Sequence, residues 1–270
     1  MDRDQPFYRY VHDACERVEI PMHAHANGQL NYVSSGRIRL LTPNSAWVVP
    51  HNRLIWIPPR QPHSVQCREL SGSWKIMVPP AYGASLPKTV AVIQPNPLLV
   101  AALEAMPGEK TAVAPTKLKL LRQLIQLELR TARTEALGVT LPKSARLRKV
   151  TDILLERPDD PRDIDSWAKE VGMSRSTFTR KFAAETGSPF ATWKTAIVLG
   201  KALDLLSEGL SIGDISSRLG YSGPSAFVAA FRRRFGAPPA QFSYDIRNSR
   251  FPREGSLIDR SRAEPKSSNE

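Results

Sequence analysis

The second half of the chain contains the same pattern of residues twice. Residues 178–193 (FTRKFAAETGSPFATW) and 227–242 (FVAAFRRRFGAPPAQF) both read Phe-x3-Phe-x4-Gly-x-Pro-x3-aromatic, and the segments that lead into them, 164–174 and 212–222, also match. A unit repeated in this way folds as the same supersecondary element in each copy. The repeat therefore limits this half of the chain to two copies of one small fold.

Each copy reads as a helix, a tight turn and a second helix. In the first copy Gly172 permits the turn, and Ser174 is expected to cap the second helix. Phe178 and Phe182, one helical turn apart, are expected to face inward. The corresponding residues of the second copy are Gly220, Ser222, Phe227 and Phe231. Each copy is thus predicted to be a helix-turn-helix, whose second helix can lie in the major groove of DNA.

Two such units joined by a long apolar helix, residues 190–209, are more specific than one. This arrangement resembles the DNA-binding domain of the AraC family of bacterial transcription regulators across roughly residues 142–245, most closely in GMSRSTFTRKFAAETG and DISSRLGYSGPSAFVAAFRRRFG. The resemblance implies two recognition helices in successive major grooves, about one helical turn (roughly 34 Å) apart. It implies a sequence-specific transcription regulator that binds double-stranded DNA, with RNA polymerase as a candidate further partner.

The first expected recognition helix is equipped to read bases. With Phe178 and Phe182 inward, its outward residues are Arg175, Ser176, Thr179 and Arg180. An arginine in this position can bridge O6 and N7 of guanine, and the hydroxyl groups can make shorter contacts. We therefore expect this helix to read bases, with Arg180 as the candidate contact to guanine.

The second expected recognition helix differs on its outward face. Ser225 and Val228 offer little hydrogen bonding to bases, whereas Arg232 and Arg233 follow near its end, where phosphate contacts are favoured. The alternative for this basic run is a solvated helix end that interacts only with the helix dipole. The two helices are thus expected to contribute unequally to specificity.

The first half of the chain predicts a β-structure. From about residue 8 to 80, short apolar runs alternate with Pro and Gly turns, which is typical of a sandwich or barrel. PMHAHANGQLNYVSSG (21–36) followed by WIPPRQPHS (56–64) resembles the two conserved segments of the cupin barrel, which many AraC-type regulators use as an effector domain. The expected fold class is α+β multidomain: a cupin-like β-barrel followed by an all-α double helix-turn-helix domain.

The cupin resemblance also implies a set of site residues. Cupin enzymes hold a metal with His-x-His, a following carboxylate and a later His, positions that match His23, His25, Gln29 and His63. Gln29 weakens the metal interpretation, because a neutral amide is a poorer ligand than a carboxylate. A polar effector pocket, a divalent metal ion and purely structural hydrogen bonds all stay open. Trp56 is expected to line an effector pocket; the alternative is that this aromatic side chain is part of the core.

The expected helix over residues 116–132 has two apolar rows. They are Leu118, Leu121, Ile125 and Leu129 on one side and Leu120, Leu124 and Leu127 on the other. This width exceeds one packing face. One row is expected to rest on the β-domain and the other on a second subunit, which gives a homodimer; the alternative is that both are buried within one chain.

Composition divides the chain further. The predicted parts are a sensor barrel over 1–94, a helical dimerisation or linker region over 95–136, the DNA-binding domain over 137–246 and a disordered tail over 247–270. Within the third part, residues 137–143 have the Gly and Pro of a linker.

The formal net charge of +12 favours a polyanionic partner such as nucleic acid. The start of the chain has no apolar core and no later stretch approaches 18 apolar residues, so neither secretion nor a membrane span is expected. The chain has only 2 Cys, which fits a reducing cytoplasm.

A different class of protein is the main rival. A cupin metalloenzyme, such as an oxygenase or isomerase, would use the helical half only for association. Gln29 and the outward Arg180 argue against it, and the sequence contains neither a Gly-x-Ser-x-Gly motif nor a phosphate-binding Gly-rich loop. We therefore expect a regulator without catalytic residues.

Overall fold

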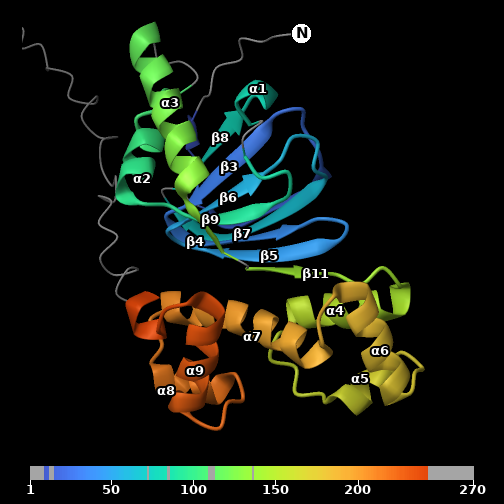
Figure 1. Ribbon diagram of the computed structural model, residues 1–270. Helices are drawn as coiled ribbons and strands as arrows, with labels where there is room; N and C mark the ends of the chain where they lie inside the picture. The colour runs from blue at the N-terminus through green and yellow to red at the C-terminus, as the bar shows by residue number, and fades with distance from the viewer. Residues whose placement is uncertain are drawn as a thin grey trace, which may run out of the picture.

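The computed structural model describes residues 9–11, 15–71, 73–83, 86–108, 113–135 and 137–242. Two antiparallel β-sheets form the first part of the chain and a set of helices forms the second (Figure 1). The predicted fold class, a β-domain followed by an all-α double helix-turn-helix domain, is confirmed. The predicted tail, residues 247–270, lies outside the described residues.

The two sheets lie face to face as a β-sandwich. The first contains β1 (Arg9–Val11), β8 (Trp74–Val78), β3 (Gly28–Val33), β6 (Arg53–Ile57), β9 (Ala91–Gln94) and β10 (Arg133–Glu135), in that order. The second contains β11 (Gly138–Thr140), β5 (Ser45–Pro50), β4 (Ser35–Leu41), β7 (His63–Ser71) and β2 (Cys15–His23), in that order.

The first sheet is buried on both faces. Along β6, Ile55 and Ile57 face the second sheet, whereas Leu54 and Trp56 face the helices on the other side. A strand covered on both sides needs apolar residues at consecutive positions, which explains the unbroken run Leu54–Ile57. The β-domain therefore has three layers, with helices, first sheet and second sheet stacked in turn.

Helices α2 (Pro97–Glu104) and α3 (Pro115–Thr131) form the outer layer over the first sheet, and the short α1 (Pro80–Gly83) lies nearby (Figure 1). Ile125 and Leu129 are buried against the sheet. By contrast, Leu120 and Leu127 are 61% and 59% exposed. The expectation that one row packs on the β-domain is confirmed, and the alternative that the chain buries both rows is wrong for these two leucines.

The prediction of a linker over residues 137–143 is corrected by the structure. Gly138–Thr140 form strand β11, which pairs with β5. Gly138 lies so close to Trp47 that a Cβ atom would come within 2.3 Å of the indole Nε1. The glycine therefore permits close packing of two strands rather than flexibility.

The helical domain consists of α4 (Ala145–Glu156), α5 (Ile164–Glu170), α6 (Arg175–Thr186), α7 (Phe190–Ser207), α8 (Ile212–Arg218) and α9 (Pro224–Phe235). Phe178 and Phe182 are fully buried in one helix-turn-helix, and Phe227 and Phe231 are fully buried in the other. The predicted inward faces are thus confirmed. None of the described helices is both long and apolar enough to cross a membrane.

The turns of the two units follow the same design. Gly172 and Gly220 have φ of 65° and 74°, a left-handed conformation that glycine adopts without a steric penalty. Ser174 caps α6 as predicted, since its side chain accepts a hydrogen bond from the Thr177 amide. The prediction of Ser222 as the second cap is wrong: the cap position is Gly223, because Pro224 begins the helix one residue later.

Candidate DNA interface and sensor site

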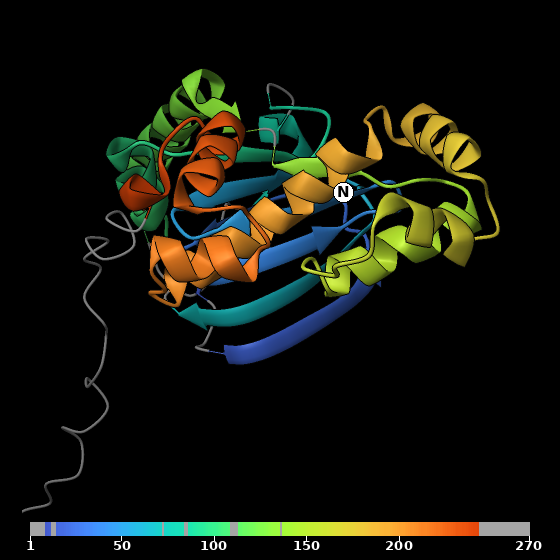
Figure 2. The same ribbon diagram turned by 90° about the horizontal axis from the view of Figure 1, so that it is seen from below.

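Helix α7 connects the two helix-turn-helix units and places α6 and α9 at opposite ends of the helical domain (Figure 1). Viewed from below, α7 runs diagonally across the strands of the second sheet (Figure 2). One helix therefore fixes the spacing of the recognition helices and also forms the contact with the β-domain.

The solvent-facing side of α6 carries the four predicted DNA-contacting residues. Arg175, Ser176 and Arg180 are exposed, and Thr179 is half-buried. The guanidinium of Arg175 forms an ion pair with Asp165 of α5, at 2.7 Å. Within the described parts of the chain Arg180 makes no hydrogen bond or ion pair, so its donors are available to a ligand.

Thr179 has a narrower role than the sequence suggests. Its hydroxyl donates to the main-chain oxygen of Arg175 at 2.8 Å, which uses its single proton within the helix. Towards DNA this side chain can therefore offer only acceptor lone pairs and its methyl group.

The corresponding side of α9 is shallow and mostly apolar. Ser225 is exposed, Val228 is half-buried, and Arg232 and Arg233 are exposed at its end. These four residues line an open groove together with Pro224 and Ala229. The structure thus brings together all the α9 residues predicted to contact DNA.

Arg234 departs from the expected basic run. Its Nη2 lies 3.4 Å from the main-chain oxygen of Gly138 in the β-domain, and burial lowers the pKa of its guanidinium. Because three consecutive helical residues spread over more than half a turn, one of the three arginines must point back into the protein. Arg234 is therefore part of the domain contact, and Arg232 and Arg233 remain on the open face.

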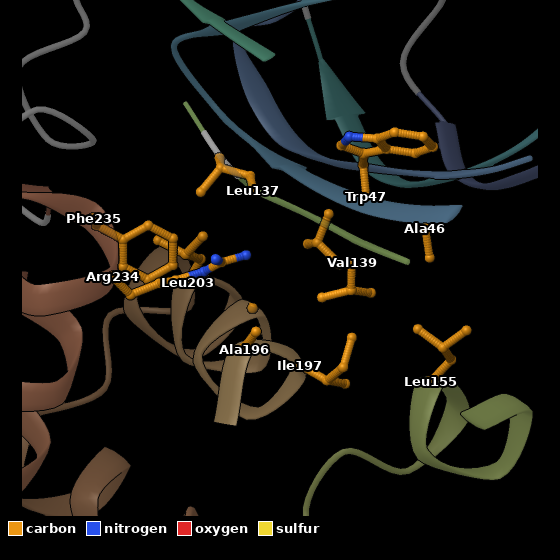
Figure 3. Close-up of a pocket in the computed structure, with 12 residues that line it drawn as sticks. Ala46, Trp47, Leu137, Val139, Leu155, Ala196, Ile197, Leu203, Arg234 and Phe235 are labelled. Atoms are coloured by element: carbon orange, nitrogen blue, oxygen red, sulfur yellow. The ribbon is translucent and has the colours of Figure 1, made fainter. Parts of the chain in front are cut away.

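The contact between the two domains is both apolar and polar. A small pocket between them has Trp47, Leu137 and Val139 on the β-domain side and Ala196 and Ile197 on α7 (Figure 3). Around it, Trp193 Nε1 donates to the Thr140 oxygen at 2.8 Å, Arg39 donates to the Leu155 oxygen, and Arg37 pairs with Asp204. Sequence reasoning missed these residues, since the alternation of Arg37, Ile38 and Arg39 shows only that both arginines point outward.

Three histidines meet at one end of the second sheet. His23 ends β2 and is paired in register with His63 at the start of β7, while His25 lies in the loop that follows β2. Their ring centroids are 4.3 to 5.8 Å apart, and each ring offers a nitrogen within 4.8 Å of the others. The predicted histidine constellation is therefore assembled.

Each imidazole of this cluster is oriented by the main chain. The Nδ1 atoms of His23, His25 and His63 lie 2.9, 2.5 and 2.8 Å from the carbonyl oxygens of Pro21, Asn27 and Gln61, respectively. His63 is 0% exposed and its Nε2 has no hydrogen-bond partner among the described residues. Burial lowers the pKa of His63, and the neighbouring His23 and His25 lower it further, against the hydrogen bond to Gln61.

Gln29 joins the same cluster from β3. Its Oε1 lies 2.9 Å from Nε2 of His25, and its Nε2 donates to Oδ1 of the buried Asn31 at 2.9 Å. Both residues lie on the face of the first sheet that is turned towards the second sheet, as the register of Gln29 with Ile57 requires. The cluster thus sits between the two sheets.

Trp56 does not join this cluster. It lies opposite Leu30 in the register and therefore on the other face of the first sheet, where it is fully buried among residues packed against α2 and α3. Its indole donates to the Pro87 oxygen at 2.7 Å. The expectation that Trp56 lines the effector pocket is corrected, because neighbouring strand residues point to opposite faces.

Comparison with known proteins gives two domain matches. The AraC-like ligand binding domain family matches residues 6–86, and a helix-turn-helix domain family matches residues 167–244. The first match falls on the β-domain and the second on the helical domain.

Individual relatives are regulators. The HTH-type transcriptional regulator NimR of Escherichia coli K12 is 24% identical over 235 residues, which cover 86% of this chain and 85% of NimR. RipA of Corynebacterium diphtheriae, also an HTH-type transcriptional regulator, is 33% identical over 103 residues, 38% of this chain and 31% of RipA. A solved structure of ToxT from Vibrio cholerae covers 89% of this chain and 98% of its own at 13% identity, with a TM-score of 0.37.

Proposed function

This chain belongs to the AraC family of transcription regulators, with a ligand-binding domain and a helix-turn-helix DNA-binding domain, and we propose that it reads its operator mainly through α6. The observation that carries the proposal is the contrast between two otherwise similar helices. Helix α6 exposes an unengaged arginine beside hydroxyl groups near its start. The groove on α9 begins instead with Pro224, Ser225, Val228 and Ala229, and its arginines, Arg232 and Arg233, lie at its end.

Arg180 is the proposed base-reading residue. Its guanidinium is exposed and has no partner to release within the described residues, so a bidentate contact to guanine requires no intramolecular bond to break. Arg175 must first leave Asp165, but an exposed pair of this kind contributes little. Ser176 and Thr179 complete the reading surface of α6.

The second helix is proposed to hold the DNA backbone. Arg232 and Arg233 are exposed at the end of α9, where their charge suits phosphate oxygens, and Ser225 and Val228 lie at its start. Contacts of this kind position the protein without selecting a sequence. Both recognition helices thus bind, but only one discriminates strongly.

The β-domain is proposed to sense a small-molecule effector at His23, His25, Gln29 and His63. These residues bring several polar side chains together between the two sheets, and Nε2 of the buried His63 has no hydrogen-bond partner among the described residues. A site of this composition recognises polar ligands through a few fixed groups. Trp56 is not part of the proposed site.

Assembly and location are also proposals. The exposed Leu120 and Leu127 of α3 suit a helix-to-helix contact with a second copy, which would make the regulator a homodimer. We place it in the cytoplasm, with RNA polymerase as the partner through which a bound dimer would act.

The relatives are transcriptional regulators, and we propose that this chain has no catalytic role. The rival cupin metalloenzyme would turn over a substrate without DNA. In the proposed function the histidines sense a ligand rather than transform one.

Electrophoretic mobility shift tests the proposal. DNA from upstream of the protein's own gene and its neighbours would be titrated with the protein at several salt concentrations. We expect one fragment to bind far more tightly than unrelated DNA of equal length, with affinity falling steeply as salt rises. Equal affinity for all fragments at every salt concentration would contradict sequence-specific binding.

A further inference from the structure

A groove lies between the two recognition helices on the exposed side of α7, and we call it the central groove. Its walls are β11 (residues 138–140), the first half of α7 with the turn before it (186–199) and the end of α9 (230–234). Its volume is about 520 Å³. Arg233 lines both the central groove and the shallow groove on α9. The central groove therefore continues the surface that is proposed to bind DNA.

The lining of the central groove favours an anion. It contains two arginines, Arg233 and Arg234, and no acidic side chain within the part of the chain that the structure describes. Most of its other lining residues are Gly, Ala, Ser or Thr, so short side chains leave room for a wide, rigid ligand. The charged pocket between the two domains differs, because Glu156, Asp159 and Asp204 line it together with basic residues. A polyanion thus fits the central groove better than it fits that pocket.

Two hydroxyl groups of the central groove can donate to a ligand. Thr140 and Thr192 are exposed, and their hydroxyls make no hydrogen bond within the described ranges. The hydroxyl of Thr195, by contrast, donates to the Ala191 oxygen at 2.8 Å, so it can only accept. Phosphate oxygens accept hydrogen bonds, and hydroxyl groups and arginines are their usual donors in DNA complexes. Thr140, Thr192 and Arg233 therefore form a donor set that suits a phosphodiester.

Strand β11 runs beside α7 and is held there by both helix-turn-helix units (Figure 1). Nε1 of Trp193 donates to the Thr140 oxygen at 2.8 Å, and Nη2 of Arg234 lies 3.4 Å from the Gly138 oxygen. Along its other edge β11 pairs with β5. All these contacts use the main chain of β11. The Thr140 side chain is therefore fixed at the groove by bonds that do not involve its hydroxyl.

The position of the central groove selects its ligand. When two recognition helices lie in successive major grooves, about 34 Å apart, the DNA between them presents its backbone to the helix that connects them. That backbone carries one negative charge per about 1.7 Å of helix axis. A small free anion could use the same donors, but it would not require a surface that continues onto the DNA-facing groove of α9.

We propose that the central groove holds the sugar-phosphate backbone of the DNA between the two recognition helices, with Thr140 of β11 among its phosphate contacts. The β-domain thus touches the operator directly, in addition to sensing the effector. The inference rests on the proposed function, since it requires DNA to lie across α6 and α9. It adds a contact that comes from the other domain.

The experiment changes the charge at Thr140 in the full-length protein and measures mobility shift at several salt concentrations. Thr140→Lys is expected to bind the operator and unrelated DNA at least about threefold more tightly at about 0.1 M salt, with a salt slope steeper by about one unit. Thr140→Asp is expected to bind both at least about tenfold more weakly. Both fragments respond because a phosphate contact carries no sequence information.

Thr116→Lys and Thr116→Asp are the matched controls. Thr116 is exposed at the start of α3, the end of that helix away from the helical domain, so these variants change the net charge equally without touching the groove (Figure 1). They are expected to keep the affinity and salt slope of the unmodified protein, because charges far from the DNA are screened.

Thr140 variants that behave like the Thr116 variants would overturn the contact. A loss in Thr140→Asp without a gain in Thr140→Lys would count against it as well, since damage to β11 would then explain the loss. The proposed function fails separately, if the unmodified protein binds the operator no more tightly than unrelated DNA.

Discussion

Arg37 of β4 forms an ion pair with Asp204 of α7, and this pair joins the sensor domain to the helix that holds both recognition helices. The Asp204 side chain is only 9% exposed, and the Arg37 side chain is 20% exposed. Burying the charged Asp204 carboxylate costs free energy, and the ion pair with Arg37 offsets that cost. The pair is therefore a specific point at which the two domains can be uncoupled.

Removing only Arg37 should destabilise the protein more than removing both charges. Arg37→Ala removes the ion pair of the buried Asp204 carboxylate, and we expect a loss of about 2–3 kcal/mol in the free energy of unfolding. The double variant Arg37→Ala, Asp204→Asn should recover about half of it, because the buried carboxylate that loses this ion pair is then neutral. Urea unfolding measures both values. Equal stability of the single and double variants would contradict the cost assigned to the Asp204 carboxylate after loss of this ion pair.

Arg180→Ala should reduce specificity as well as affinity. Loss of a bidentate contact to guanine costs about 1–3 kcal/mol on the operator and should relax the preference at one base pair. Selection from randomised sites followed by mobility shift measures both effects. An unchanged selected sequence, or equally strong base preferences in the two half-sites, would refute the unequal roles of α6 and α9.

Arg233→Ala is the matched comparison on α9. A phosphate contact carries no sequence information, so this variant should weaken binding to all fragments similarly and reduce the salt slope by about one unit. A change in the selected sequence would instead place Arg233 at a base.

The helical half of the fold could be predicted because its signals are local. Phe178 and Phe182 lie one turn apart, as do Phe227 and Phe231, and this spacing alone places each pair on one face. The second cap was missed by one residue, because the sequence pattern does not weigh Ser222 against a proline that starts the helix. Boundaries set by competing local signals are less certain than buried faces.

The β-half was harder because a strand has two faces and the sequence does not say what covers each. The sequence allows Trp56 to line a pocket or to be part of the core, and the alternation along β6 places it in the core under α2 and α3. The sequence predicts a linker at Gly138, whereas the structure uses this glycine for close packing against Trp47; glycine serves both purposes. Only the histidine motif was predicted well, because its members lie within two short segments that pair as neighbouring strands.

The exposed row of α3 should control assembly. Leu120→Arg combined with Leu127→Arg places two charges in the proposed contact. We therefore expect the dissociation constant of the dimer, measured by sedimentation, to rise at least about tenfold. Met22→Arg is the control, since Met22 is 51% exposed on β2 of the other sheet. If the double variant and the control sediment alike, α3 is not the dimer contact.

His51 should make the stability of the protein fall at acidic pH. Burial, with the positive Arg53 nearby, lowers the pKa of His51 from 6.5 to about 4. Between these values the unfolded chain binds a proton that the folded chain does not, so folding stability is lost as the pH falls from 6.5 towards 4 and changes no further below that. The full loss from this one group is about 3 kcal/mol. In His51→Gln all other titratable groups are unchanged, but the unfolded chain no longer binds a proton at position 51. Urea unfolding at pH 7 and at pH 4.5 measures how much unfolding free energy each protein loses between the two pH values. We expect the variant to lose about 2 kcal/mol less than the unmodified protein. Equal losses in the two proteins would contradict the assignment to His51.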